Sequence, residues 1–250
     1  MAEVITGALF DFSGTLMRVE PADSWLRAAL ERTGLSLPDE EISDLAAALE
    51  DAGALPGGSS PRHIPAALEE LWEERDRDAR RHRALYTGLA RQVPLPAPGL
   101  YDALYDRHRE PAAWHPYPDT VQVLRALRER GIPVAVVSNI GWDLRPVFRA
   151  HGLDGFVDAY LLSFEHGVQK PGPELFALAC RKLGRTPQQV LMTGDDRVAD
   201  AGAARLGCAV HLVEHLPVAD RPAGLLPVLD LIGGPAPGIG RSPAPPDTGA

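Results

Sequence analysis

The chain has 250 residues, of which 45% are hydrophobic and 24% charged, and its formal net charge is -9 at pH 7. These values are typical of one globular domain with a sizeable insertion, and the negative charge argues against binding to nucleic acid or to an anionic membrane surface. The two cysteines, Cys180 and Cys208, have no close spacing and indicate neither a disulfide framework nor a zinc site.

The N-terminal residues contain an apolar run at 5–10 but no basic flank typical of a signal peptide. No apolar stretch reaches the roughly 18 residues that a membrane span requires. We therefore expect a cytoplasmic protein.

Residues 4–12 predict a first strand that delivers Asp11 near its end. Residues 23–109 then show the apolar spacing of helices and almost no strand-like segment. After residue 116, strand-like runs alternate with amphipathic helices. The strand-like runs cover residues 132–138, 156–163, 190–194 and 209–215.

Near-continuous Val, Ile and Leu runs between helices indicate a parallel sheet covered on both faces. The sequence therefore predicts the α/β class, with a Rossmann-like core of about five parallel strands and an inserted helical cap. The expected parts are residues 1–16 and 116–232 for the core, 17–115 for the cap, and 233–250 for a disordered Pro/Gly-rich tail. We expect the two lobes to be hinged near residues 17–20 and 114–118.

Right-handed crossovers place the carboxyl ends of the strands at one edge of the sheet, where ligands of open α/β sheets bind. Several polar residues follow these strand ends in the sequence. They are Asp11, Ser138, Asn139, Lys170, Asp195, Asp196 and Asp200. A carboxylate, a hydroxyl, a cation and an acidic cluster are thus expected to meet there, which is a combination suited to phosphoryl transfer.

The segments DFSGT at 11–15, VVSN at 136–139, KPGPELF at 170–176 and GDDRVAD at 194–200 resemble the motifs of the haloacid dehalogenase superfamily. The resemblance extends from about residue 8 to residue 213 and is to the phosphohydrolases with an aspartate nucleophile. The large helical insert directly after the first motif is similar to the cap of the phosphoglycolate phosphatase-like branch.

The resemblance implies an aspartyl-phosphate intermediate, Mg²⁺ as cofactor and a small phosphorylated metabolite as substrate, in a monomer or homodimer. The implied catalytic residues are Asp11, Ser13, Ser138 and Lys170. The implied phosphate-binding residues are Gly14, Thr15, Ser138, Asn139 and Lys170. The implied metal-binding residues are Asp11, Ser13, Asp195, Asp196 and Asp200.

Ser13 departs from the family pattern, in which a second Asp protonates the leaving alcohol and later activates water. A positioned acid or base is worth about 10²–10⁴-fold in rate. We therefore expect slow turnover, above all in hydrolysis of the aspartyl phosphate, or a substitute acid. Candidates for the substitute are Asp196 and a cap carboxylate such as Glu20.

Other branches of the superfamily also lack this Asp. Phosphonoacetaldehyde hydrolases use a cap lysine, and residues 17–115 contain none. Haloacid dehalogenases need no metal. The acidic cluster at 194–196 suits magnesium and therefore disfavours a dehalogenase, which stays as a less favoured alternative. P-type ATPases carry Thr at the matching position, but their membrane helices are missing here.

The main alternative to an active enzyme is a weak or silent protein that binds a phosphorylated ligand or a protein partner. Four cap residues are candidates to face the site: Arg18, Trp25, His63 and Trp72. For the two tryptophans, packing between helices is the favoured role.

Overall fold

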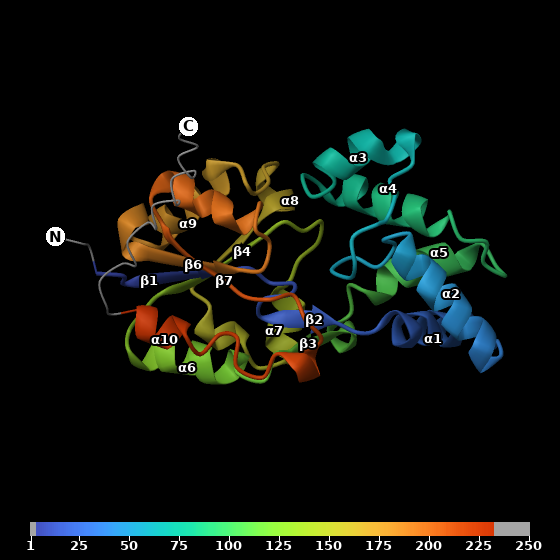
Figure 1. Cartoon of the computed structure of the whole chain (residues 1–250), viewed down its shortest axis with the longest axis horizontal. Coiled ribbons are helices and arrows are strands. Elements are labelled where there is room, and N and C mark those ends of the chain that lie inside the picture. The colour runs from blue at the N-terminus through green and yellow to red at the C-terminus, as the bar shows by residue number, and fades with distance from the viewer. Residues whose placement is uncertain (1–3, 233–250) are drawn as a thin grey trace, which may run out of the picture.

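The computed structural model describes residues 4–232, so the tail expected to be disordered at 233–250 lies outside the described residues. Two lobes lie side by side along the long axis (Figure 1). A sheet flanked by helices forms one lobe, and helices alone form most of the other. No helix in the described part of the chain has the length and apolarity needed to cross a membrane.

The core lobe is built on five parallel strands in the order β5-β4-β1-β6-β7. Their bounds are β1 (Gly7–Phe10), β4 (Val134–Ser138), β5 (Ala159–Leu162), β6 (Val190–Gly194) and β7 (Ala209–Leu212). The first strand in the sequence is thus the central one, and the helical insert leaves the sheet from its middle. The predicted α/β class, with a five-stranded parallel sheet and a helical insert, is confirmed.

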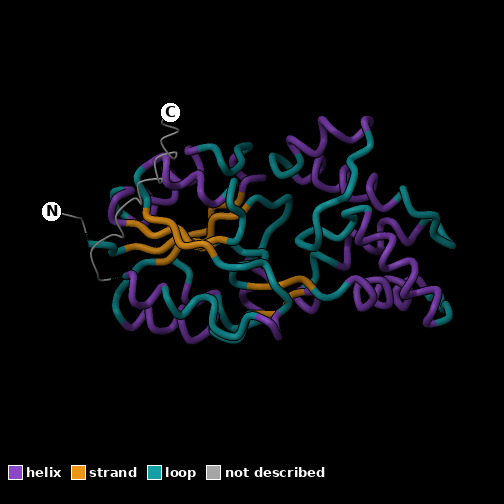
Figure 2. Tube along the Cα trace, in the orientation of Figure 1, coloured by secondary structure: helices purple, strands orange, loops and turns teal. Residues whose placement is uncertain are grey.

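Helices cover both faces of this sheet (Figures 1 and 2). On one side lie α8 (Ser163–His166) and α9 (Pro173–Leu183), and on the other lie α6 (Thr120–Glu129), α7 (Arg145–Ala150) and α10 (Val228–Leu231).

The alternation of strand side chains explains the continuous apolar runs. Leu9 packs with Phe176 of α9 in one buried cluster, whereas Phe10 belongs to a second cluster that includes Leu124 of α6. Successive residues of a strand point to opposite faces, so a strand that is covered on both sides must be apolar at every position.

The cap lobe contains five α-helices. They are α1 (Ala22–Thr33), α2 (Asp39–Asp51), α3 (Glu69–Glu74), α4 (Ala79–Ala90) and α5 (Gly99–Arg107). Trp25 and Leu26, one turn before Ala29 and Leu30, form the buried face of α1. The Trp25 indole donates a hydrogen bond of 2.8 Å to the carbonyl of Leu104 on α5, so this residue packs inside the cap as favoured.

The chain crosses between the lobes twice, and the two crossings pair with each other. Strand β2 (Met17–Val19) runs antiparallel to β3 (Trp114–Pro116), with Arg18 opposite His115. The two segments expected to form a hinge therefore contain a short two-stranded ribbon. Glu20, next to this ribbon, is buried and accepts two hydrogen bonds, of 2.7 and 2.8 Å, from Arg107.

Short 3₁₀ helices complete the fold. They are η1 (Ala66–Leu68), η2 (Pro111–Ala113), η3 (Asp154–Phe156), η4 (Pro187–Gln189), η5 (Asp200–Leu206) and η6 (Val218–Asp220). Several strands are shorter than expected: those expected at 4–12, 132–138, 156–163 and 209–215 are observed as β1, β4, β5 and β7. The helical segment expected between the last two strands begins at Asp200 and is the 3₁₀ helix η5. The Asp196 carboxylate accepts the N–H groups of Val198 and Ala199, and this local turn replaces the first helical turn.

Candidate active site

The loop after β1 holds the candidate nucleophile. Asp11 follows the last residue of the strand, and its N–H donates to the Thr193 carbonyl at 2.9 Å. Gly14 turns the loop with φ 78°, and a Cβ at this position would lie 2.2 Å from His215 Nδ1. Only glycine fits this conformation and this space. The N–H of Gly14 donates to Met17 O at 2.7 Å, so in this structure Gly14 shapes the loop and its N–H is not free for phosphate.

A buttress from the C-terminal part of the chain supports the same loop. The buried Arg221 guanidinium donates to the carbonyl of Gly14 at 2.6 Å and also to the carbonyl of Thr15. Its Cζ lies 3.2 Å from the centroid of the Tyr117 ring. The turn that presents Asp11 is therefore held by hydrogen bonds from the Arg221 guanidinium, which stacks on the Tyr117 ring.

Lys170 joins two of the acidic side chains. Its Nζ donates to Asp11 Oδ1 at 2.7 Å and to Asp200 Oδ1 at 2.5 Å. The lysine is only 4% exposed. Burial disfavours its charge, but the two carboxylates outweigh this effect and raise the pKa of Lys170, which keeps it an ammonium ion.

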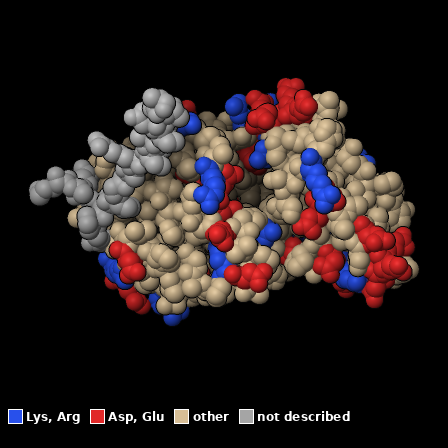
Figure 3. Space-filling model, viewed as in Figure 1, with Lys and Arg blue, Asp and Glu red and all other residues tan. Residues whose placement is uncertain are grey.

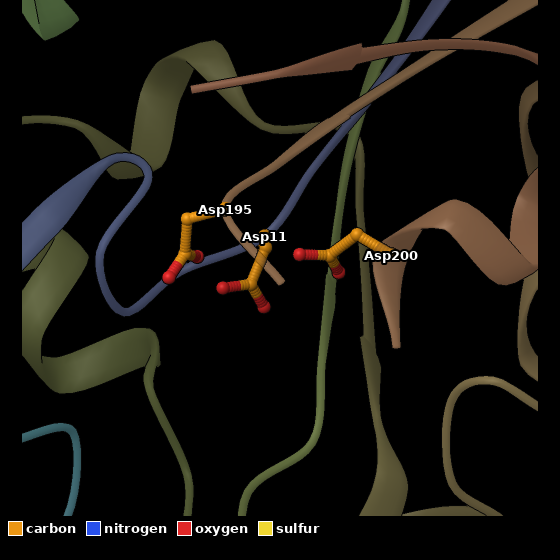
Figure 4. A group of neighbouring side chains, drawn as sticks. All are labelled: Asp11, Asp195 and Asp200. Carbon is orange, nitrogen blue, oxygen red and sulfur yellow. The ribbon is translucent and has the colours of Figure 1, made fainter. Parts of the chain in front are cut away.

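Asp11, Asp195 and Asp200 form an acidic cluster (Figure 4), with one carboxylate oxygen from each lying within 4.8 Å of the others. Burial raises the pKa of Asp11. Lys170 opposes this shift, whereas the charges of Asp200 and Asp195 add to it. Three carboxyl groups around one ammonium oppose one another's ionisation, and a bound cation would offset this repulsion. Oxygen ligands in this arrangement fit a hard divalent cation such as Mg²⁺.

Asp195 is also bonded from two sides. Thr15 Oγ1 donates to its Oδ1 at 3.0 Å, and His215 Nδ1 donates to its Oδ2 at 2.6 Å. Burial acts to raise the pKa of Asp195, but the interactions with His215 and Thr15 outweigh it and lower the pKa. Asp195 is therefore held as a carboxylate, and the Thr15 hydroxyl is directed to it.

The strand end of β4 supplies two more of the expected residues. Ser138 is buried and lines the same cavity as Asp11. The Asn139 side chain clamps the backbone of Lys170: it donates from Nδ2 to the lysine carbonyl at 2.9 Å and accepts at Oδ1 from the lysine N–H at 2.8 Å. In this structure Asn139 therefore positions Lys170.

The site residues come from four separate segments of the chain, and this arrangement agrees with a match to known proteins. A family profile described as haloacid dehalogenase-like hydrolase matches residues 5–207. The chain belongs to this family of hydrolases.

The relatives of this hydrolase include phosphatases. Ribulose-1,5-bisphosphate 5-phosphatase of Halopiger xanaduensis is 30% identical over 216 residues, which cover 84% of each chain. Phosphoserine phosphatase of Thermus thermophilus is 30% identical over 217 residues, which cover 79% of this chain and 84% of the relative. Among solved structures, a dehalogenase covers 94% of this chain and 100% of its own, with a TM-score of 0.64 and 21% identity, and this is a likeness of fold alone.

A cap loop of the hydrolase closes directly over Ser13. The Ser13 Oγ lies 3.5 Å from the carbonyl oxygen of Gly57, to which Arg18 also donates at 2.6 Å. A Cβ on Gly57 would lie only 2.6 Å from Ser13 Oγ and 2.8 Å from the Trp114 ring. The small residues at positions 13 and 57 therefore allow the cap and the nucleophile loop to approach each other closely.

The cleft between the lobes contains a cavity of about 580 Å³ that these residues share. Figure 3 shows the surface hollowed between the two lobes. Core residues Asp11, Ser138 and Lys170 line the cavity from one side, and cap residues such as Trp72 and Asp76 line it from the other.

The expected residues are not all gathered at the acidic cluster. The carboxylate of Asp196 caps its own turn, with Oδ1 accepting from Val198 N at 2.7 Å and from Ala199 N at 2.8 Å. The proposed substitute acid Glu20 is bound to Arg107 and is not among the lining residues, and neither is the exposed His63.

Sequence reasoning missed three residues that the fold brings to the cavity: Asp76, His82 and His215. The first two lie in a charged stretch of the cap, and His215 follows a strand with no motif around it. Nothing in their local sequence separates them from ordinary surface residues, because only the tertiary fold brings them to the site.

Proposed function

We propose that this hydrolase removes the phosphoryl group of a small phosphate ester through an aspartyl phosphate on Asp11. One observation carries the proposal: the Lys170 ammonium lies between the Asp11 and Asp200 carboxylates, beside Asp195, on the wall of the cavity between the lobes. The similarity to phosphatases such as those described above supports a phosphorylated metabolite as substrate.

The residues present fit Mg²⁺, and Asp11, Asp195 and Asp200 are the side chains that would hold it. When bound, the ion would supply positive charge between the anionic ester and the carboxylate nucleophile. Asp196, expected from the motifs as a further ligand, lies outside this acidic cluster, and its carboxylate caps its own turn.

In the proposed reaction, an Asp11 oxygen attacks phosphorus while the bond to the leaving oxygen breaks. Lys170 keeps Asp11 oriented and balances its charge, and the Ser138 hydroxyl binds a phosphoryl oxygen. Water then attacks the aspartyl phosphate, which releases inorganic phosphate and restores the Asp11 carboxylate. The cap excludes bulk water during transfer.

Ser13 has no ionisable group, so it neither protonates the leaving oxygen nor activates water as a carboxylic acid does. The proposal therefore includes slow hydrolysis of the aspartyl phosphate unless another group acts. Esters of acidic leaving groups, such as phenols, need less help in the first step and are the best first substrates.

A panel of phosphate esters, assayed with and without Mg²⁺, tests the proposal. We expect phosphate release that depends on Mg²⁺ and falls to background in Asp11→Asn. The matched control is Asp143→Asn, which removes a carboxylate outside the cavity. Tight binding of beryllium fluoride with Mg²⁺, lost in Asp11→Asn, provides a second readout that does not need the natural substrate.

Two results would overturn the proposal. Failure to turn over any ester and to bind beryllium fluoride would favour a silent binding protein. Halide release from a 2-haloacid without added metal would favour a dehalogenase.

A further inference from the structure

The turn between α3 and α4 carries a cap residue into the catalytic cavity. Figure 1 shows this corner of the cap next to α8 of the core. The N–H of Asp76 donates to Gln169 Oε1 at 2.9 Å, and its carbonyl accepts from Ser163 Oγ at 2.6 Å. Gln169 immediately precedes Lys170. Two core residues therefore fix Asp76 beside the lysine that holds the nucleophile.

The Asp76 carboxyl is buried without a hydrogen bond. The residue is 4% exposed, and it lines the same cavity as Asp11. Within residues 4–232, no group donates a hydrogen bond to either carboxyl oxygen. The nearest ionic partners are Arg75 Nε at 3.4 Å and His82 Nε2 at 3.7 Å. A carboxyl on the wall of a cavity that has ion-pair partners but accepts no hydrogen bond can still form one with a ligand there.

The surroundings of this carboxyl favour proton exchange. Burial raises the pKa of Asp76, while the charges of Arg75 and Lys170 oppose that shift. Burial, with Arg75 and Arg109 adding to it, lowers the pKa of His82 to about 3, so this histidine is neutral at pH 7. Its Nδ1 lies 2.8 Å from the Tyr105 hydroxyl, which fixes the ring with Nε2 towards Asp76.

The other carboxylates that line the cavity in the described part of the chain have other environments. Asp11, Asp195 and Asp200 form the acidic cluster, and Asp196 caps its own turn. The remaining one, Glu73, is exposed to solvent. Asp76 is thus the lining carboxyl that is buried, accepts no hydrogen bond in the described part of the chain and lies outside the cluster.

We propose that Asp76 is the general acid and base of the reaction, in place of the carboxyl that Ser13 does not provide. The inference rests on the function proposed above. As Asp11 attacks and the bond between phosphorus and the leaving oxygen breaks, the Asp76 carboxyl gives its proton to that oxygen. In the second step the Asp76 carboxylate takes a proton from the attacking water, phosphate leaves Asp11, and both residues return to their starting states.

The test compares Asp76→Asn with Glu73→Gln, a neighbouring carboxylate on the same wall. The substrates are 4-nitrophenyl phosphate, with an acidic leaving group, and a simple alkyl phosphate, with a basic one. We expect Asp76→Asn to lose about 10²–10⁴-fold in kcat/KM on the alkyl ester but less than about tenfold on the aryl ester. Glu73→Gln should keep the ratio of the two values within about threefold, because this carboxylate is exposed to solvent and transfers no proton in the proposed reaction.

The ratio of the two kcat/KM values is independent of the folded fraction, since unfolding lowers both equally. An unchanged ratio in Asp76→Asn, with wild-type turnover intact, overturns the role of Asp76 and leaves the proposed function standing. If the wild type turns over no ester of the panel and does not bind beryllium fluoride with Mg²⁺, the proposed function fails and this assignment with it. Should Asp76→Asn not fold, Asp76→Glu replaces it: its moved carboxyl should change the ratio, and the wild-type ratio would overturn the inference.

Discussion

Replacing Lys170 by methionine removes the one ammonium that faces two buried carboxylates. Asp11 is 7% exposed and Asp200 is 1% exposed, so neither can exchange the lost partner for bulk water. Breaking a buried ion pair by removing one partner costs about 3–5 kcal/mol of unfolding free energy. For a domain of this size, each kcal/mol corresponds to about 2–4 °C in Tm, so we expect Lys170→Met to lower Tm by roughly 6–20 °C at pH 7.

The loss of stability should depend on pH with a definite sign. Burial already raises the pKa of Asp11 and of Asp200, and Lys170 opposes both shifts. Without Lys170, both pKa values in the folded state rise further above the unfolded value of about 3.9. Between these values the folded variant binds more protons than the unfolded chain, so its stability falls as pH rises. The deficit relative to wild type should therefore be smaller at pH 5 than at pH 8.

Urea unfolding between pH 5 and pH 8, in metal-free buffer, measures this deficit. The control is Lys182→Met, which removes the only other lysine, an exposed one, and should change stability by less than about 0.5 kcal/mol. A Lys170→Met variant no less stable than Lys182→Met, or a deficit that does not change with pH, would refute the electrostatic account of the site.

Mg²⁺ at 100 times its Kd should stabilise the wild type by about 2.7 kcal/mol, and thermal unfolding should show no such gain in Asp195→Asn; equal gains in both proteins would place the ion elsewhere. Gly57→Ala should cost about 1–3 kcal/mol and lower kcat/KM, because its Cβ would meet Ser13 and Trp114 at 2.6 and 2.8 Å. The matched control is Gly34→Ala, which has a similar positive φ of 70° but no neighbour within 4 Å of the added Cβ, so thermal unfolding should show a smaller loss and activity should not change. Equal losses in the two variants would mean that the cap loop does not close on Ser13.

The parallel sheet, and the edge of it at which the polar residues meet, were predictable because both follow from the periodicity of apolar residues. Continuous apolar runs marked the strands, and parallel pairing then required that Asp11, Ser138 and Asp195 share one edge. The structure does bring these residues together around Lys170.

The helices of the cap were predictable, but the cap side chains that line the cavity were not. Whether Trp25 or Trp72 faces the cavity depends on how helices pack, and Trp25 bonds to Leu104 whereas Trp72 lines the cavity. Asp196 and Asp200 could not be separated by sequence, because both follow β6 and only the local turn directs one carboxylate towards Lys170. Asp76 reaches the site through contacts 87 and 93 residues away in sequence, with Ser163 and Gln169, which no local pattern records.

The Arg221 buttress has a consequence for how the enzyme matures during synthesis. Arg221 lies 207 residues after Gly14, whose carbonyl it supports, and Lys170 lies 159 residues after Asp11. When only the β1 loop and the cap have left the ribosome, neither Lys170 nor Arg221 is yet available to support the loop. We therefore expect a nascent chain that has not yet released Arg221 to be unable to take a phosphoryl group onto Asp11.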